Sequence, residues 1–422
     1  MTPDAFIKQN SCMDDYDPAS LPADIALKKI LEAIIPIESL EKLTVRNALN
    51  RVLAEDITSN INVPSGTNSA MDGYAIFSSD LPAQGTCELR IAGTAFAGKP
   101  YKEKLFPGEC VRIMTGAIMP EGTDTVVIQE HAERSGNTIR IGADTKTGAN
   151  VRAAGEDIAV GDTALEKGRR LTPADIGLIA SLGIAEVKVT RKLRVAFFST
   201  GDELRSVGDK LEDGQIYDSN RYTLHGMLTR LGVDIIDMGV IRDDRADLQQ
   251  GFGKAAKSAD VLITTGGVSV GETDYVKEIL EKVGTVNFWK IAMKPGRPLA
   301  YGKIKDTIFF GLPGNPVSAM VTFYQFVQPA LRYLMGEQQI EPVTVKILCK
   351  SRLKKRPGRI EYQRGILERD QSGQLVVRKT GAQGSGILRS MSQANCFIIL
   401  PMESGDVELD TLVDVQPFFG LV

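Results

Sequence analysis

Apolar residues near the start of the chain recur at roughly helical spacing. They fall in the stretch PADIALKKILEAIIP, residues 22–36, and comprise Ile25, Leu27, Ile30, Leu31 and Ile34. Such spacing is typical of one face of an amphipathic helix. Pro36 ends the pattern, because proline cannot continue a helix. The sequence therefore predicts an amino-terminal helix, preceded by a flexible leader over residues 1–19.

From residue 60 to residue 159 the apolar residues instead form short runs separated by glycine and proline. Examples are CELRIAG, ECVRIMTG, TDTVVIQE and NTIRIG. Short apolar runs with turn residues between them are typical of strands, so we expect a separate, mostly β domain over residues 60–159. Residues 20–59 and 160–190 then form a linking domain, whose amino-terminal helix we expect to pack on the sheet domain described next.

The linking domain contains a second predicted helix, in LTPADIGLIASLG. Thr172 suits the N-cap position, Pro173 suits the first helical residue and Gly183 suits the carboxyl-terminal stop.

Residues 191–337 alternate between continuous apolar runs and helical patterns. RVAFFST, VDIIDMGV, ADVLITT and TIFFGLP are predicted strands; SNRYTLHGMLTRLG, RADLQQGFGKAAK and ETDYVKEILEKVG are predicted helices. Strands that are apolar throughout, alternating with helices, indicate a parallel sheet covered on both faces. Residues 338–422 return to short strands and turns such as VTVKILCK and NCFIILP. These favour a small barrel or sandwich, and we expect a C-terminal β-barrel. The predicted fold is thus multidomain α/β with a central parallel sheet.

Length and composition agree with several folded domains. The chain has 422 residues, 43% of them hydrophobic and 24% charged, and a chain of this length exceeds what one core supports. A net charge of -3 gives no general attraction to nucleic acid or to an anionic membrane, so we expect neither as a partner. The first residues are too acidic for a secretory signal, and we expect a cytoplasmic protein.

The scarcity of histidine and the spacing of cysteine limit the possible chemistry. The five cysteines show no CxxC spacing, and there are only two histidines. This argues against a disulfide framework, a zinc site and a Ser-His-Asp triad. The chemistry must therefore use carboxylates, lysines, hydroxyl groups and the backbone.

Polar residues cluster where the predicted parallel strands end. Ligands of open α/β sheets bind beyond the carboxyl ends of the strands, and the loops there contain Glu203, the Asp218-Ser219-Asn220 run, Asp243 and the stretch TTGGVSVGETDYV, residues 264–276. Each loop also has a plainer interpretation, as a turn, a helix cap or a solvated loop. Their coincidence at one edge favours a ligand site.

The glycines at residues 266 and 267 predict a phosphate cradle. Gly266 and Gly267 would let backbone N–H groups approach a phosphate at the start of the next helix. A carboxylate such as Asp274 would repel that phosphate unless a divalent cation lay between them, and oxygen ligands suit Mg²⁺. In WKIAMKPGRP, Lys290 and Lys294 would add positive charge beside the anion. The basic run SRLKKRPGR is interpreted as a solvated face.

Eight motifs in order carry a resemblance to a known family. NSAMDGYA, RIMTGA, GEDI, FSTGDEL, GQIYDSNR, TTGGVSVGETDY, MKPGRP and GLPGNPVSA together resemble the MoeA family of molybdopterin molybdenumtransferases and the matching half of gephyrin. The match runs from about residue 20 to the end. The resemblance implies an enzyme that takes adenylylated molybdopterin and molybdate as substrates, inserts molybdenum and releases AMP with the help of Mg²⁺.

The resemblance also implies partners. We expect a homodimer, small-molecule substrates and an association with the molybdopterin adenylyltransferase, which the sheet domain resembles, or with other enzymes of the cofactor pathway. The alternative is a non-catalytic molybdopterin-binding scaffold of gephyrin type.

Site residues follow from the motifs by position. The implied catalytic residues are Asp72, Thr115, Glu203, Asp243, Asp274, Lys290 and Lys294, with Asp243 and Asp274 as ligands of Mg²⁺. The implied residues for binding the pterin nucleotide are Arg152, Asp218, Ser219, Asn220, Gly266, Gly267, Ser269, Pro313 and Pro316. The implied molybdate pocket consists of Lys294, Ser318, Arg364 and Ser385, which are cationic and hydroxyl donors suited to a tetrahedral oxyanion.

Overall fold

The computed structural model describes residues 19–267 and 275–418. Its contacts divide the chain into two units. One unit consists of residues 42–49 and 53–188, and the other contains the remaining described residues. No helix in these ranges is long and apolar enough to cross a membrane.

The second of these units is built on a mixed sheet, in which six described strands follow the order β16-β13-β17-β21-β20-β18. The first four strands are parallel to one another, as the apolar runs predict. Strand β20 pairs antiparallel with β21, and β18 pairs antiparallel with β20. The strand bounds are β13 Arg194–Thr200, β16 Asp234–Ile241, β17 Val261–Thr265, β18 Thr285–Lys290, β20 Pro298–Ile304 and β21 Thr307–Leu312. A short parallel pair, β14 Leu204–Arg205 and β15 Ile216–Tyr217, lies in the loop after β13.

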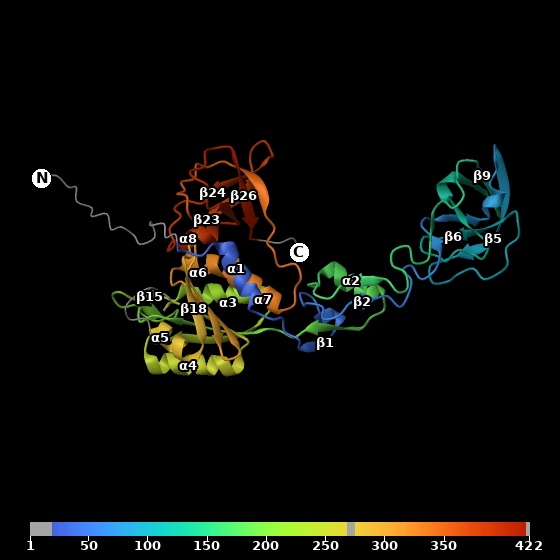
Figure 1. Cartoon of the computed structure of the whole chain (residues 1–422). Helices are drawn as coiled ribbons and strands as arrows, with labels where there is room; N and C mark the ends of the chain where they lie inside the picture. Colours follow the sequence, from blue (N-terminus) through green and yellow to red (C-terminus); the bar gives the residue numbers. More distant parts are fainter. Residues whose placement is uncertain (1–18, 268–274, 419–422) are drawn as a thin grey trace. The chain divides into compact units, whose positions relative to one another are not determined.

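Helices cover both faces of this sheet (Figure 1). Alternate residues of β13 belong to opposite cores, with Phe197 among the residues packed under α3 and α6 and Phe198 among those packed under α4 and α5. This follows from the two-residue repeat of a strand. The helix bounds are α3 Ser219–Leu231, α4 Arg245–Ser258, α5 Tyr275–Val283, α6 Pro316–Thr322 and α7 Gln328–Leu334, with a π-helical turn, η4 Phe323–Val327, between the last two.

The amino-terminal helix α1, Ala23–Glu32, packs in the same core. Ala26 and Ile30 are fully buried and share a cluster with Phe323 and Leu331 of η4 and α7. The predicted helix is therefore present, and it ends four residues before Pro36.

The carboxyl-terminal strands close into a five-stranded barrel. The described strands pair in the ring β23-β24-β22-β26-β25, because β25 also pairs with β23. Their bounds are β22 Val345–Cys349, β23 Ile360–Arg369, β24 Leu375–Lys379, β25 Cys396–Leu400 and β26 Thr411–Pro417; α8 Leu388–Gln393 precedes β25. The two-residue strand β19, Met293–Lys294, joins the barrel, because it pairs in parallel with Ile360 and Glu361 of β23.

The other unit contains the mostly β domain, a sheet of strands in the order β7-β4-β6-β5-β9-β8. Both faces of β4 are buried, with Tyr74 and Ala75 in different apolar clusters. The bounds are β4 Gly73–Ile76, β5 Thr86–Ala95, β6 Glu109–Ile113, β7 Thr125–Ile128, β8 Ala132–Ser135 and β9 Thr138–Gly142, with 3₁₀ turns η2 Ser78–Asp80 and η3 Gln129–His131.

Several short elements complete the description of the chain. Helix α2, Pro173–Ser181, begins as predicted at Thr172, which forms a reciprocal capping box with Asp175. The remaining elements pair as β1 Leu40–Thr44 with β12 Glu186–Thr190, β2 Ile57–Thr58 with β11 Thr163–Leu165, and β3 Asn68–Ser69 with β10 Val151–Arg152; η1 is Val45–Asn47.

Candidate functional site

The loops at the carboxyl ends of the parallel strands meet around the start of α3. Asp218 caps this helix by accepting a hydrogen bond from the backbone N–H of Arg221 at 3.1 Å, and Ser219 is its first residue. The side-chain Nδ2 of Asn220 donates to the backbone carbonyl of Gly314 at 2.7 Å. Helix α3 is thereby tied to the 313–316 loop, in which Pro313 follows β21 and Pro316 begins α6.

Two buried oxygens at the start of α3 have no hydrogen-bond partner in the described structure. They are Oδ2 of Asp218 and Oδ1 of Asn220, in side chains that are nine-tenths or more buried. A buried polar atom without a partner is costly unless a ligand, ion or water satisfies it. These atoms therefore suit a polar ligand at the position that the sequence predicts.

Gly266 follows β17 with a backbone that only glycine fits. Its φ is +84°, and a Cβ atom there would lie 2.3 Å from the backbone oxygen of Thr200. The next residue, Gly267, also has a positive φ. The two glycines of the predicted phosphate cradle thus form a tight turn after β17, whereas Ser269 and Asp274 lie outside the described residues.

Carboxylates of two neighbouring loops face one another. Burial raises the pKa of the Asp243 carboxyl above its ordinary value, and the negative charges of Asp202 and Glu203 raise it further. Oδ1 of Asp243 is buried without a hydrogen-bond partner. A carboxylate that is desolvated beside two others favours a cation, and oxygen ligands suit Mg²⁺. Asp243 therefore fits the predicted metal.

The described residues do not complete a metal site. In the ranges 19–267 and 275–418, no group of three or more His, Cys, Asp or Glu side chains is arranged to hold a metal ion. Of the two predicted ligands, Asp243 is described and Asp274 is not.

A second, cationic pocket lies where β19 meets the barrel. It has a volume of about 260 Å³. The charged residues in its wall are Lys294, Lys354, Glu361, Arg364 and Lys379. Lys290 precedes Lys294 in the chain and is the last residue of β18. Its backbone carbonyl accepts a hydrogen bond from the backbone N–H of Leu21 at 2.7 Å.

Arg364 is the fixed cation of this pocket. It is 1% exposed, its Nε donates to Oγ of Ser390 at 3.1 Å, and its Nη2 donates to the carbonyl of Gly384 at 3.2 Å. Burial lowers the pKa of the guanidinium to about 10, although the charge of Glu361 opposes this shift. The side chain therefore remains charged at neutral pH.

The two predicted hydroxyl residues are placed on either side of the 313–316 loop. Ser385 follows Gly384, and its Oγ accepts a hydrogen bond from Nδ2 of Asn315 at 3.2 Å. Its backbone carbonyl accepts from Val317 of α6 at 3.0 Å, one residue before the buried Ser318. Lys294 and Arg364 line the cationic pocket, whereas Ser318 and Ser385 are not among its lining residues. The hydrogen bonds of Ser385 connect its segment to the 313–316 loop and to the start of α6.

In the other unit, Asp72 and Thr115 are in direct contact. The backbone N–H and the hydroxyl group of Thr115 both donate to Oδ1 of Asp72, each at 2.7 Å. Arg152 lies in β10, where it pairs with Asn68 of β3. Three residues predicted from separate motifs therefore belong to neighbouring segments of this unit.

Glu361 was not predicted, and the basic run before it is solvated only in part: Arg352, Lys354 and Arg356 are exposed as expected. Of the residues in SRLKKRPGR, Lys355 and Arg359 are buried rather than solvated, and Nζ of Lys355 donates to three backbone carbonyls. Glu361 is 4% exposed. The signal was the alternation of Ile360, Glu361, Tyr362 and Gln363 at the start of β23, which places the two polar side chains on one face.

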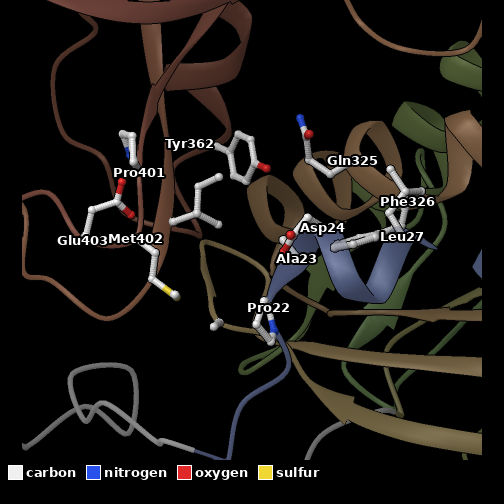
Figure 2. Close-up of a pocket in the computed structure, with 12 residues that line it drawn as sticks. Pro22, Ala23, Asp24, Leu27, Gln325, Phe326, Tyr362, Pro401, Met402 and Glu403 are labelled. Atoms are coloured by element: carbon white, nitrogen blue, oxygen red, sulfur yellow. The ribbon is translucent and has the colours of Figure 1, made fainter. Parts of the chain in front are cut away.

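A third hollow is mainly apolar. It has a volume of about 440 Å³, and Figure 2 shows Leu27 of α1 and Phe326 of η4 lining it on one side and Tyr362 of β23 on the other. Asp24 and Glu403 place carboxylates at its wall. No sequence motif predicted this pocket.

Three family models cover the chain in succession. The MoeA N-terminal region, domains I and II, matches residues 21–183; a probable molybdopterin binding domain matches residues 196–333; and the MoeA C-terminal region, domain IV, matches residues 346–418. A molybdopterin molybdenumtransferase of Haemophilus influenzae is 48% identical over 404 residues, which are 95% of this chain and 100% of the relative. This chain belongs to the MoeA family. It is an enzyme of molybdenum cofactor biosynthesis.

Two further relatives support the MoeA assignment. A crystal structure of a molybdopterin biosynthesis MoeA protein from Pyrococcus horikoshii is 30% identical with a TM-score of 0.83, covering 94% of this chain and 100% of that one. Gephyrin of Dictyostelium discoideum is 38% identical to this chain. The matched region covers 93% of this chain and 61% of the gephyrin. The predicted MoeA architecture, with a mostly β domain, a molybdopterin-binding-like domain and a C-terminal barrel, is confirmed.

Proposed function

We propose that this MoeA-family enzyme inserts molybdenum from molybdate into adenylylated molybdopterin, with Mg²⁺-dependent release of AMP. One observation carries the proposal: the 313–316 loop contacts the start of α3 and the segment next to Arg364. The carbonyl of Gly314 accepts from Asn220 at the sheet edge, and Asn315 donates to Ser385, whose neighbour Gly384 accepts from Arg364 of the cationic pocket. These contacts support a nucleotide site and an oxyanion site that lie close together.

The sheet edge is the proposed site of the adenylylated pterin. Gly266 and Gly267 bring backbone close to the phosphates, while Asn220 and Asp218 offer unpartnered oxygens to polar groups of the ligand. Asp243 and Asp274 would hold Mg²⁺, which, when bound, would neutralise charge on the phosphate link as it breaks. Glu203 adds negative charge beside Asp243.

The cationic pocket is the proposed site of molybdate. Arg364 and Lys294 supply positive charge, and Ser318 and Ser385 supply hydroxyl donors. Lys290 would add charge towards the phosphates. In this proposal the protein acts by positioning and electrostatics, and none of its side chains forms a covalent bond to the substrate.

The β domain and the partners complete the proposal. We infer a cytoplasmic homodimer, in which Asp72, Thr115 and Arg152 serve a site that a second subunit shares. The adenylylated substrate must come from a reaction that transfers AMP to molybdopterin, so a molybdopterin adenylyltransferase is the expected partner.

The decisive experiment measures AMP release from adenylylated molybdopterin by the purified protein with Mg²⁺, with and without molybdate. The product is then used to reactivate a cofactor-free molybdoenzyme. Molybdate-dependent release together with reactivation supports metal insertion. Substrate that binds and is never cleaved would instead identify a molybdopterin-binding scaffold of gephyrin type.

A further inference from the structure

The cationic pocket contains one carboxylate, that of Glu361. Oxyanion sites are normally built from donors alone, since a carboxylate repels an anion. Yet Glu361 is 4% exposed in the pocket wall. Its Oε2 accepts a hydrogen bond from Nε2 of Gln363 at 3.1 Å, and its Oε1 lies 3.6 Å from Nζ of Lys294. The buried Lys355 and Arg364 also interact with its charge, and Lys294 is the most exposed of these three cations.

The two main cations of the pocket are held very differently. Two nitrogens of the Arg364 guanidinium donate to Ser390 and Gly384, so its position is fixed. Lys294 has a side chain that is 40% exposed, and its distance to Glu361 exceeds that of a normal hydrogen bond. The ammonium group is therefore held by charge and is able to turn.

Strand pairing keeps Lys294 within reach of Glu361. The two residues are direct register partners in the parallel pair β19–β23, so the backbone sets their separation independently of the side chains. An oxyanion in the pocket and the carboxylate of Glu361 then compete for the same ammonium group.

We propose that Glu361 is a positioning residue for Lys294: its carboxylate holds the ammonium group in the free pocket, and an entering tetrahedral oxyanion takes that group over. The inference rests on the proposed oxyanion-binding function of this pocket. It follows that Glu361 weakens oxyanion binding. The pocket combines one fixed cation, Arg364, with one exchangeable cation, Lys294, which also favours release of the anion.

Titration calorimetry of the full-length protein with molybdate, and separately with sulfate, at fixed ionic strength tests the inference. The Glu361→Gln variant keeps the shape of the side chain and its hydrogen bond from Gln363 but loses the charge. We expect it to bind either anion about tenfold more tightly, because the ammonium group of Lys294 no longer has to leave a carboxylate a few ångströms away before it meets the anion. A role limited to supporting the fold would weaken binding instead.

Matched variants separate the possible causes. Glu408→Gln makes the same charge change at an exposed pair with Arg352 and is expected to leave affinity unchanged. Glu361→Asp keeps the charge and is expected to bind close to wild type, which keeps the test usable should Glu361→Gln not fold. In a Lys294→Met background, the gain from Glu361→Gln is expected to shrink to the small direct effect of removing one negative charge, well below tenfold.

Three results would overturn the inference. Unchanged or weaker binding by folded Glu361→Gln protein would remove Glu361 from this role. A full tenfold gain in the Lys294→Met background would show a general field effect that does not act through Lys294. If neither wild type nor Glu361→Gln protein binds molybdate or sulfate, the proposed oxyanion pocket fails and the inference fails with it.

Discussion

The carboxylate oxygen Oδ1 of Asp72 accepts two hydrogen bonds from the single residue Thr115, one from its backbone N–H and one from its hydroxyl group, both at 2.7 Å. The backbone hydrogen bond, followed by that of the hydroxyl group, holds the pKa of Asp72 below its ordinary value. Asp72 therefore stays ionised to a lower pH than a free aspartate. Thr115 is the main cause of this shift, and the charge of Arg112 adds a smaller lowering of the pKa.

Replacing Thr115 with Val is expected to raise the pKa of Asp72 only part of the way. The variant loses the hydroxyl donor but keeps the backbone N–H, which is the larger cause of the shift. In the AMP-release assay, the acid limb of the pH profile should move to higher pH while activity near neutral pH largely remains. Thr123→Val, which loses a hydrogen bond to the carbonyl of Pro120, is the control. An acid limb that does not move would argue that Asp72 does not need its charge.

Replacing Asp243 with Asn is expected to stabilise the metal-free protein and to remove its response to Mg²⁺. Burial and the charges of Asp202 and Glu203 raise the pKa of Asp243, so ionisation at neutral pH opposes folding. The destabilising effect grows as the pH rises from the ordinary aspartate pKa through the raised one.

Thermal unfolding at pH 7 with and without Mg²⁺ provides the measurement. A cation present at about 100 times its Kd would stabilise the wild-type protein by about 2.7 kcal/mol, and the variant should show almost no shift. Asp244→Asn, at the N-cap of α4, is the neighbouring control. A full Mg²⁺ response in the Asp243→Asn protein would place the metal elsewhere.

Replacing Asp260 with Ala is expected to destabilise the sheet domain by about 1–2 kcal/mol, because it removes the partly buried counter-charge of two partly exposed arginines. Arg191 and Arg194 donate to its carboxylate at 2.7–2.9 Å. Burial alone would raise the pKa of Asp260, but these hydrogen bonds outweigh it and hold the pKa far below the ordinary range.

The pH dependence of this effect has a definite sign. Since the folded-state pKa is lowered, the stabilisation is fully present above the unfolded pKa of about 3.9 and is lost as the pH falls below it. Urea unfolding can be followed by the fluorescence of Trp289, the single tryptophan. The difference in the free energy of unfolding between wild type and variant should narrow below about pH 4. A difference that does not change with pH would assign the effect to packing.

Replacing Gly266 with Ala is expected to destabilise the same domain by about 1–3 kcal/mol, the range for a strained backbone conformation. The new Cβ would lie 2.3 Å from the carbonyl oxygen of Thr200, at a φ of +84°. Gly253→Ala is the matched control, since it lies exposed in α4 with open space around its Cα. There, alanine should stabilise by about 0.5–1 kcal/mol. Equal effects at the two positions would contradict the steric argument.

The sequence predicted those elements whose signals are local. The apolar runs of β13 and β17 and the Thr172 cap of α2 each lie within a few consecutive residues. The antiparallel strands β18 and β20 were not predicted, because Pro298–Ile304 shows neither strict alternation nor a glycine turn.

Individual residues of the candidate site, such as Lys294 and Arg364, were predicted from the sequence. Their neighbours in space were not. The pairing of Lys294 with Glu361 joins two distant segments through β19 and β23, and no local pattern encodes it. The burial of Lys355 was missed for the same reason, since its three carbonyl partners lie partly in the loop after β25.

The pairing of β19 with β23 sets a condition on when the cationic pocket can exist during synthesis. Lys294 leaves the ribosome well before its register partner Glu361, and β23 is in turn held by β25, which ends at Leu400. A nascent chain that has already completed the parallel strands of its sheet therefore still lacks the pocket. Only an almost finished polypeptide presents it, so fragments from premature termination would not sequester the oxyanion.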